Sequence, residues 1–272
     1  MLQKVHFISG LPRSGSTLLS AVLRQNPRFQ TAVTSPLPML TAALQGRMGS
    51  GTEFSVFFDD ERRKRLLRGL FDSYYGNLPD DAVLFDTNRA WTGKMALLAQ
   101  LFPQSRIICC VREIGWIIDS LERLQNENPT QLSRLFNSRH AASVYSRVET
   151  LMNSNTGLIG RAWSTLREAW FGARARRLIL IQYESLARDP ARVLGRLYEE
   201  LGEPAFAHDF QQVAYDEPEY DRQLGLPGLH TVRPRVEFHK RESCLPPDLF
   251  AKYADASFWT RPELNRRQVT IL

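Results

Sequence analysis

Short apolar runs, each closed by a polar residue or a glycine, alternate along the chain with longer segments whose apolar residues recur at helical spacing. Short runs rich in β-branched residues predict buried strands, and apolar spacing of three or four predicts helices. The predicted strands are residues 5–9, 30–34, 82–85, 106–112 and 177–182. The predicted helices are residues 16–26, 36–48, 60–75, 91–102, 113–128, 130–152, 158–174 and 189–201.

Strands that alternate with helices favour a parallel sheet with helices on both faces. We therefore expect a three-layer α/β/α fold with a central parallel sheet, in which ligands bind at the carboxyl ends of the strands. The length of 272 residues suits one large domain spanning 1–272, and no internal repeat divides it. Residues 203–272 are rich in proline, charge and aromatic residues, so we expect a mostly irregular segment that completes the site.

Charge adds a preference for anionic ligands. The net charge is +6 at pH 7, and the sequence pI is about 9.4. A solvated basic surface explains this balance, but basic residues also recur at the ends of predicted strands, which favours a small polyanion. The sequence has no recognised nucleic-acid motif and no basic run interleaved with aromatic residues, so we expect no nucleic-acid partner. No run approaches 18 apolar residues, so we expect no membrane span.

The cysteines and the first residues bear on the compartment. Cys109 and Cys110 are adjacent within an apolar run, and in a strand their side chains point to opposite faces. We therefore expect two small core residues rather than a disulfide framework. The apolar run near the first residue is too short for a secretory signal. These features predict a cytoplasmic protein.

The stretch GLPRSGST, residues 10–17, follows the first predicted strand and opens the first predicted helix. It fits the phosphate-binding pattern G-x-x-x-x-G-K-[ST], except that Ser16 replaces the lysine. Free backbone N–H groups at a helix N-terminus bind anions whatever side chains surround them. Arg13 supplies a cation from a different position, and the hydroxyl groups of Ser14, Ser16 and Thr17 add donors.

Two other interpretations of this loop remain open. A kinase acting on a nucleoside triphosphate would lack its lysine here, although the run VLFD ends at Asp86 as a Walker-B carboxylate would. The simpler alternative is an ordinary glycine turn after a strand. Against it, strand, loop and helix follow one another in the order that a phosphate site requires.

The residues PRSGSTLL resemble the 5′-phosphosulfate-binding loop of sulfotransferases that use 3′-phosphoadenosine-5′-phosphosulfate (PAPS). The likeness is greatest to the tyrosylprotein and bacterial branch of that family. It implies a P-loop-like fold, PAPS as the sulfuryl donor and no required metal ion. It also implies that the donor is bound by Arg13, Ser14, Gly15, Ser16, Thr17 and Leu18.

Further matches follow in the family's order. The family binds the 3′-phosphate with an arginine at the end of a buried strand and a serine eight residues later, and Arg112 and Ser120 have that spacing. The family's Tyr-Glu-x-Leu segment has its tyrosine beside the nucleotide, where this chain has Tyr183. A late basic loop also meets the 3′-phosphate, for which Arg233 or Lys240 is a candidate. Considered without the other matches, Arg112 could instead form a surface salt bridge, and Tyr183 could belong to the core.

The family's catalytic bases are missing. The tyrosylprotein branch has a glutamate about twenty residues after the loop arginine, where this chain has Thr34. The cytosolic branch has a Lys-Thr-His segment, whose lysine falls at Thr87 and whose histidine falls at Asn88. The general base must therefore come from elsewhere, unless an acceptor phenol needs little help from the protein.

Other residues are candidates for the missing chemistry. Arg13 and Arg89 would stabilise negative charge on the sulfonate and on the leaving phosphate. His230 is the first candidate base because an imidazole loses its proton near neutral pH, and Asp86 is the second. Arg89 could instead be an exposed loop arginine, and His230 could have a structural role. Remoter candidates are Glu53, Asp59 and Asp60.

The leading hypothesis is a PAPS-dependent sulfotransferase that acts on a hydroxyl acceptor. An acidic tyrosine-containing peptide suits the positive charge, and a small hydroxylated molecule is the alternative acceptor. A degenerate P-loop kinase is the enzymatic rival, and a catalytically inactive nucleotide-binding module is the non-enzymatic one. The sequence leaves the oligomeric state open, with a homodimer as one option.

Overall fold

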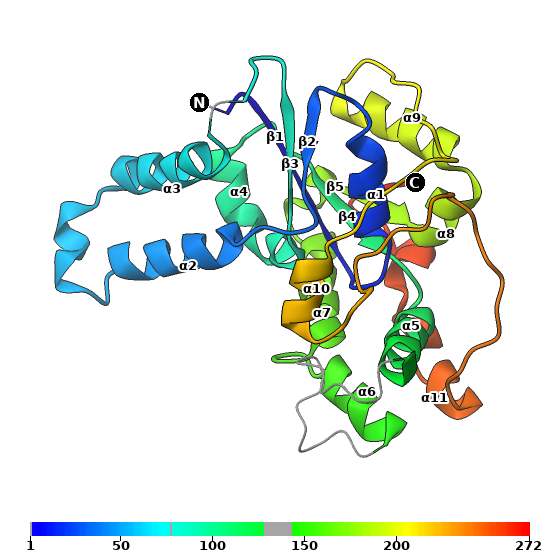
Figure 1. The fold of residues 1–272 in the computed structure, drawn as a ribbon. Coiled ribbons are helices and arrows are strands. Elements are labelled where there is room, and N and C mark those ends of the chain that lie inside the picture. Colours follow the sequence, from blue (N-terminus) through cyan, green and yellow to red (C-terminus); the bar gives the residue numbers. More distant parts are fainter. Residues whose placement is uncertain (1, 77, 128–142) are drawn as a thin grey trace.

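The computed structural model describes residues 2–76, 78–127 and 143–272. At its centre is a six-stranded sheet in the order β2-β3-β1-β4-β5-β6, and every neighbouring pair is parallel (Figure 1). The strands are β1 (Lys4–Gly10), β2 (Phe29–Thr31), β3 (Val83–Thr87), β4 (Ile107–Val111), β5 (Leu178–Gln182) and β6 (Thr270–Ile271). In the centre of the sheet, Ile8 lies opposite Thr87 of β3 and opposite Ile108 of β4.

The central strands are buried on both faces, which explains why their sequences are continuous apolar runs. Successive residues enter two different cores. Phe7 and Cys109 belong to one core, and Ile8 and Cys110 belong to the other. The expected opposite orientation of the two cysteines is thus confirmed, and both are free and fully buried.

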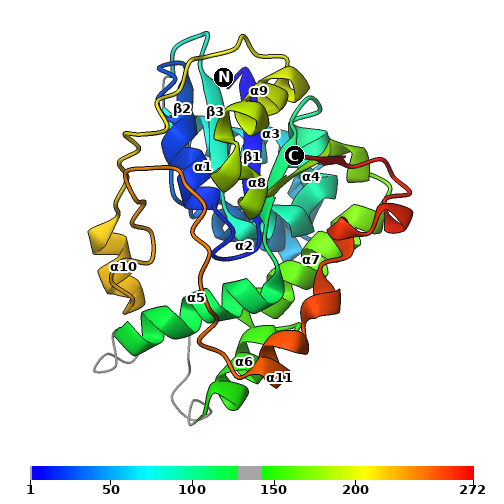
Figure 2. The same ribbon diagram turned by 90° about the vertical axis from the view of Figure 1, so that its right-hand side faces the viewer.

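Helices cover both faces of the sheet (Figures 1 and 2). Leucines of the helices on one face join the core around Ile8; these helices are α1 (Ser16–Leu23), α8 (Tyr183–Arg188) and α9 (Pro190–Leu201). The other core is closed by α3 (Asp60–Tyr75), α4 (Met95–Leu101), α5 (Ile114–Glu127), α6 (Val144–Met152) and α7 (Leu158–Phe171). The predicted three-layer α/β/α fold with a central parallel sheet is confirmed.

Helix boundaries follow local capping chemistry. The helix predicted at 60–75 has those bounds in the structure, because the Asp59 carboxylate accepts the backbone N–H of Arg62 at 2.7 Å. The segment predicted as one helix at 91–102 begins instead as the 3-10 helix η2 (Arg89–Lys94) and becomes α-helical only in α4. Of the helix predicted at 130–152, residues 130–142 lie outside the described residues, and α6 forms the remainder.

Several short elements have no counterpart among the predictions, among them β6 and α8. β6 has only two residues, too few to leave a recognisable pattern, and it pairs with β5 by placing Thr270 opposite Ile179. α8 follows β5 without an intervening loop. The remaining elements are α10 (Pro218–Leu224), α11 (Pro247–Ala251) and the 3-10 helices η3 (Ala175–Arg177), η4 (Ala254–Ala256), η5 (Phe258–Thr260) and η6 (Pro262–Leu264).

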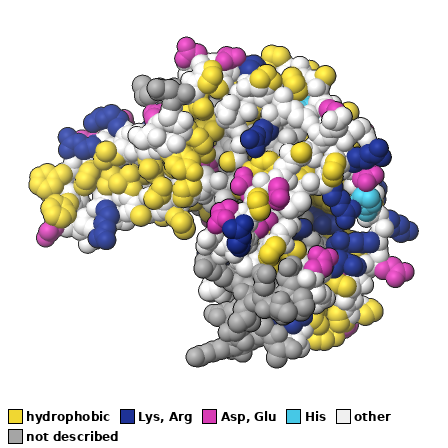
Figure 3. All heavy atoms as spheres, viewed as in Figure 1, with side chains coloured by type: hydrophobic (Ala, Val, Ile, Leu, Met, Phe, Trp, Pro, Cys, Tyr) yellow, Lys and Arg dark blue, Asp and Glu magenta, His cyan; other side chains and the backbone are white. Residues whose placement is uncertain are grey.

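A helical arm projects from the body of the molecule beside the sheet (Figure 1). It consists of α2 (Leu37–Met48), the 3-10 helix η1 (Glu53–Phe57) and α3. Its base packs on the body through Leu37, Leu67 and Phe71, all of which are buried. Hydrophobic side chains gather along the arm from base to tip on the side seen in Figure 3.

Candidate active site

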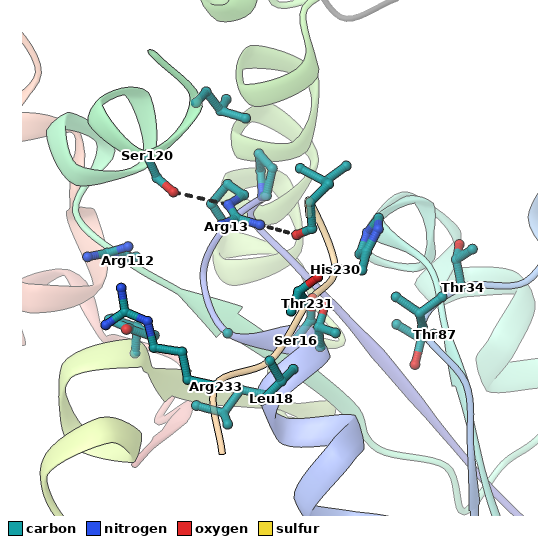
Figure 4. A pocket seen from close by; sticks show the side chains of 18 of the residues that line it. Arg13, Ser16, Leu18, Thr34, Thr87, Arg112, Ser120, His230, Thr231 and Arg233 are labelled. Atoms are coloured by element: carbon teal, nitrogen blue, oxygen red, sulfur yellow. Dashed lines mark hydrogen bonds between the residues drawn. The ribbon is translucent and has the colours of Figure 1, made fainter. Parts of the chain in front are cut away.

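The residues directly after β1, β3, β4 and β5 meet at one edge of the sheet, because parallel strands end there together. A cavity of about 390 Å³ lies at this edge, and residues of α10 and of the segment 229–241 form part of its wall. Figure 4 shows side chains from both parts of the chain around it. The candidate residues that line the cavity are Arg13, Gly15, Ser16, Thr17, Leu18, Arg89, Arg112, Ser120, Tyr183, His230 and Arg233.

The loop after β1 is shaped by two glycines. Gly10 has a φ of 115°, and a Cβ there would lie 2.1 Å from the carbonyl oxygen of Cys110, so only glycine fits against β4. Gly15 has a φ of 92° and is the residue before α1. Ser14 is buried and donates its hydroxyl to the carbonyl oxygen of Pro12 at 3.2 Å. The loop thus brings the N-terminus of α1, with Ser16 and Thr17, to the cavity.

Arg13 leaves this loop and spans the cavity (Figure 4). Its backbone has a φ of 56°, a left-handed conformation that is uncommon outside glycine. Its Nε donates to Ser120 Oγ at 3.0 Å, and its Nη1 donates to the carbonyl oxygen of Leu229. Burial lowers the pKa of Arg13 below its ordinary value, and the nearby charge of Arg112 lowers it further. An anion between these two guanidinium groups would relieve that repulsion.

Arg112, directly after β4, has an incomplete set of partners. Its guanidinium carbon lies 4.2 Å from the centre of the Tyr183 ring, and its Nε lies 3.6 Å from a carboxylate oxygen of Glu184, beyond hydrogen-bond distance. The side chain is only 12% exposed, and its Nε has no hydrogen-bond partner. Buried donors in native proteins are nearly always paired, so this one points to a ligand that carries acceptor oxygens.

Arg241 also lines the cavity, although the sequence analysis missed it. It donates to the buried carboxylate of Asp119, which also accepts the backbone N–H of Cys244 at 2.8 Å. The basic run HKR, residues 239–241, could have indicated Arg241, but the sequence analysis names only Lys240 of this run as a candidate for the 3′-phosphate. Lys240 lines an adjoining cavity of about 430 Å³, to which Arg112 and Arg241 also contribute.

His230 forms a carboxylate–imidazole pair with the buried Asp221, a residue that the sequence analysis did not identify. Asp221 of α10 is fully buried and accepts the His230 backbone N–H at 2.8 Å and its Nδ1 at 2.5 Å. Because a carboxylate accepts at Nδ1, the ring carries its proton there and leaves Nε2 as a free acceptor. Burial lowers the pKa of His230, Asp221 opposes this, and the charges of Arg13 and Arg89 lower it again.

Arg89 is the first residue of η2 and lines the cavity. Its backbone is fixed by Ser9, whose hydroxyl donates to the Arg89 carbonyl oxygen at 3.0 Å. The residue is exposed to solvent at the cavity, and within the described residues its guanidinium forms no ion pair. Partial loss of hydration lowers its pKa. Its charge is therefore available to a ligand or to the acceptor.

The residues at the positions of the family bases have structural roles. Asn88 is the N-cap of η2: its Oδ1 accepts the Ala90 N–H at 2.9 Å, and its Nδ2 donates to the Ser35 carbonyl oxygen at 2.9 Å. Thr34 lies near it, with its hydroxyl oxygen 3.5 Å from the Asn88 Nδ2. Thr34, Thr87 and Asn88 line the cavity but contain no group that would accept a proton at neutral pH.

The predicted position of Asp86 is wrong. The residue lies inside β3, which continues to Thr87, and its side chain is fully buried away from the cavity. Its carboxylate accepts from Tyr75 at 2.5 Å, from Trp91 at 2.6 Å and from Ser35 at 2.8 Å. Burial raises its pKa. The remoter candidates Glu53, Asp59 and Asp60 are on the arm, and none lines the cavity.

Metal-binding clusters and membrane-spanning helices are both absent from the described part of the chain. No group of three or more His, Cys, Asp or Glu side chains there is arranged to hold a metal ion. No described helix has the length and apolar character needed to cross a membrane.

Comparison with known proteins shows which family the chain belongs to. No curated protein matches its sequence. The sulfotransferase domain of the curacin biosynthetic pathway is similar in structure, with a TM-score of 0.56, 18% identity and coverage of 93% of this chain and 97% of that one. The structure of mouse sulfotransferase SULT7A1, solved with PAP, is similar with a TM-score of 0.50 and 14% identity. The similarity covers 98% of this chain and 88% of that one.

A second biosynthetic domain extends this comparison. The sulfotransferase domain of the Synechococcus PCC 7002 olefin synthase has a TM-score of 0.51, 18% identity and coverage of 93% of this chain and 94% of that one. At such low identity these structures establish a shared fold. The family model described as "Sulfotransferase family" matches residues 6–208, from β1 to the residues just beyond α9. The chain therefore belongs to the sulfotransferase family.

Proposed function

We propose that this sulfotransferase moves a sulfuryl group from PAPS to a hydroxyl acceptor. One observation carries the proposal: Arg13 and Arg112 face the same cavity beside a lysine-free helix N-terminus, and the buried Nε of Arg112 has no partner. Two guanidinium groups with lowered pKa values favour a ligand with more than one anionic group. PAPS carries phosphate at two positions and a terminal sulfonate, so it matches this demand.

Each end of the donor has candidate partners. The N-terminus of α1, from Gly15 to Leu18, and the Arg13 side chain would hold the 5′-phosphosulfate. Arg112 and Ser120 would hold the 3′-phosphate, with Arg233 as a further cation on the cavity wall. Tyr183, on which Arg112 stacks, would lie beside the nucleotide.

The carboxylate–imidazole pair supports a base-assisted transfer. Nε2 of His230 would take the proton from the acceptor hydroxyl while the oxygen of that hydroxyl forms a bond to the sulfur of the donor. The bond between sulfur and the bridging oxygen breaks, and its electrons stay on the 5′-phosphate of the leaving nucleotide. Asp221 would stabilise the imidazolium that forms, and Arg13 and Arg89 would stabilise the charge on the sulfonate and phosphate oxygens.

The acceptor would enter from the side of the C-terminal segment. Arg235 is exposed on the cavity wall there, and its positive charge suits a tyrosine flanked by acidic residues. The same end also has apolar walls from Leu158, Leu224 and Leu229, which suit a small hydroxylated molecule. Both acceptor classes remain in the proposal, and mass spectrometry of products formed from PAPS separates them.

The rival kinase finds less support. Its magnesium ion would need Asp86, but both oxygens of that carboxylate already accept hydrogen bonds from neighbouring side chains. The inactive nucleotide-binding module would bind the same nucleotide and differs only in lacking turnover. Turnover of PAPS with any hydroxyl acceptor excludes that module.

Calorimetry with adenosine 3′,5′-bisphosphate tests the donor site. We expect measurable binding to the wild type and a loss of about 30-fold or more in Arg112→Ala, because a charge-assisted pair in a buried site disappears. Arg196→Ala, which removes an exposed arginine on α9, is the matched control and should bind like the wild type. Absence of binding at millimolar nucleotide would falsify the proposal.

A further inference from the structure

The helical arm exposes most of the large hydrophobic side chains that the described molecule leaves in solvent. We call six of them the arm face: Met39 (72% exposed), Leu40 (43%), Phe54 (58%), Val56 (81%), Phe57 (61%) and Leu66 (42%). In Figure 3, hydrophobic atoms run along the arm, while basic groups stand at its edges. Soluble monomers rarely leave so much contiguous apolar surface uncovered, and larger patches mark interaction sites.

The exposed side of α2 explains why this surface is unusual. Its inner side buries Leu37, Thr41 and Met48, as expected for a helix that packs on its neighbours. Its outer side carries Met39, Leu40 and two alanines before the first charge at Arg47. Gln45 is the one other polar side chain on this outer side, so a largely apolar helix surface, which is normally enclosed, lacks a partner within the described part of its own chain.

The tip of the arm is held in place although it buries little. No residue of η1 is buried. The segment after it is nevertheless fixed, because Asp59 caps α3 and Arg62 donates to the carbonyl oxygen of Phe57. Phe54, Val56 and Phe57 are therefore presented on a structured support, and their apolar side chains contribute nothing to the core of this chain.

The charge of the arm distinguishes between the partners that could cover its apolar face: an anionic membrane, an acidic protein or a second copy of this chain. Residues 37–75 contain six basic and five acidic side chains, so the arm is nearly neutral on a chain with a net charge of +6. Some of these charges already pair on α3, Arg63 with Asp60 and Lys64 with Glu61. The arm therefore has little attraction for an anionic membrane or an acidic protein. Two copies of it can meet without like-charge repulsion.

The exposed area of the arm face would supply a substantial part of a homodimer interface. Aromatic side chains bury about 150–250 Å² each when covered, so the exposed fractions of Phe54 and Phe57 alone correspond to roughly 240 Å², and the four aliphatic side chains of the arm face add to this area. A standard interface buries ~800 Å² on each partner. A two-fold axis brings the same face of both copies together, which is the commonest arrangement of homodimers.

We propose that two copies of this chain associate through their arm faces, α2 and η1 of one copy packing against the same elements of the other. No residue of the arm face lines the active-site cavity, so the proposed interface uses none of the residues assigned to the site. The proposal is independent of the sulfuryl donor and the acceptor.

Sedimentation equilibrium from about 1 to about 100 µM protein tests the association. The wild type should reach twice the 31.2 kDa mass of one chain. Val56→Glu should weaken dimerisation by at least about 30-fold, because each dimer would bury that charge twice within its interface. The substitution is safe for folding since Val56 is 81% exposed. Phe206→Glu, at a residue 37% exposed outside the arm, is the control and should remain dimeric.

Hydrogen exchange locates the interface. Amides of α2 and η1 in the wild type should exchange more slowly at high protein concentration than at low concentration, and in Val56→Glu this difference should vanish. A monomeric wild type, a dimeric Val56→Glu variant or protection confined to another surface overturns the proposal. So does a monomeric wild type that floats with phosphatidylcholine vesicles, which would make a lipid surface the occupant of the arm.

Discussion

At the donor end of the cavity, Arg13 and Arg112 follow directly after the strands that position them, whereas at the other end His230 is held from α10, far along the chain. The donor end therefore depends on short segments next to β1 and β4. The His230 end depends on a tertiary contact, since Asp221 must fold against the loop that carries the imidazole.

The two ends also differ in electrostatics. At the donor end, burial lowers the pKa values of Arg13 and Arg112, and the charge of Arg112 lowers that of Arg13 further. The Nε of Arg112 is unpaired. At the other end, Asp221 satisfies His230 within the protein. The donor end thus has an unpaired donor that an anion would complete, while the carboxylate–imidazole pair already has its internal hydrogen bonds, as the proposed proton transfer requires.

The largest expected effect comes from the donor end. Arg13→Ala should reduce sulfuryl transfer by at least about 10³-fold, because it removes a buried cation beside the leaving group and the sulfonate. Steady-state turnover with PAPS and any accepted hydroxyl measures this. Arg192→Ala, which removes an exposed arginine paired with Asp189, is the matched control. Turnover of Arg13→Ala within tenfold of the wild type would contradict the role given to Arg13.

The sequence indicated that the loop after β1 and Arg112 would lie at one edge of the sheet, because the signals of both segments are local. Gly10 and Gly15 must be glycine where the loop touches β4 and turns into α1, and such constraints leave a motif of fixed spacing. Arg112 stands one residue beyond a continuous apolar run that only a buried strand explains. Parallel strands then bring these separate motifs to one edge of the sheet without further information.

The other end could not be predicted in the same way. Asp221 lies in the short helix α10, and Arg241 lies in a segment without regular structure. Nothing in the sequence around them indicates that Asp221 would contact His230 or that Arg241 would contact Asp119. Asp86 illustrates the opposite error. A carboxylate after an apolar run suggests a strand tip, yet β3 continues one residue further, and Tyr75, Trp91 and Ser35 satisfy the buried charge.

An intermediate effect is expected at His230. His230→Gln should reduce kcat/KM by about 10²-fold, since general-base assistance is lost while the side chain keeps a similar size. Nucleotide affinity should stay near that of the wild type, which calorimetry with adenosine 3′,5′-bisphosphate checks. His208→Gln, which alters a histidine that does not line the cavity, serves as control. Equal losses in nucleotide affinity and turnover would assign His230 to binding rather than to proton transfer.

The smallest effect, and the most specific, belongs to Asp221, which acts on the acceptor only through His230. The base works as neutral imidazole, so activity rises with pH through the pKa of His230, and this midpoint should lie below the ordinary value of 6.5. Asp221 raises that pKa against burial and against the charges of Arg13 and Arg89. Asp221→Asn should therefore move the midpoint to lower pH and reduce the plateau by about tenfold.

The shift in midpoint separates a positioning role from a structural one. A merely destabilised protein would lose activity at every pH without moving the midpoint, and its thermal unfolding would report the damage. Asp248→Asn, at an exposed residue of α11, should leave both midpoint and plateau unchanged. If Asp221→Asn keeps the wild-type midpoint at full plateau, the buried carboxylate does not act on the base, and His230 then reaches its working pKa through burial and the neighbouring arginines alone.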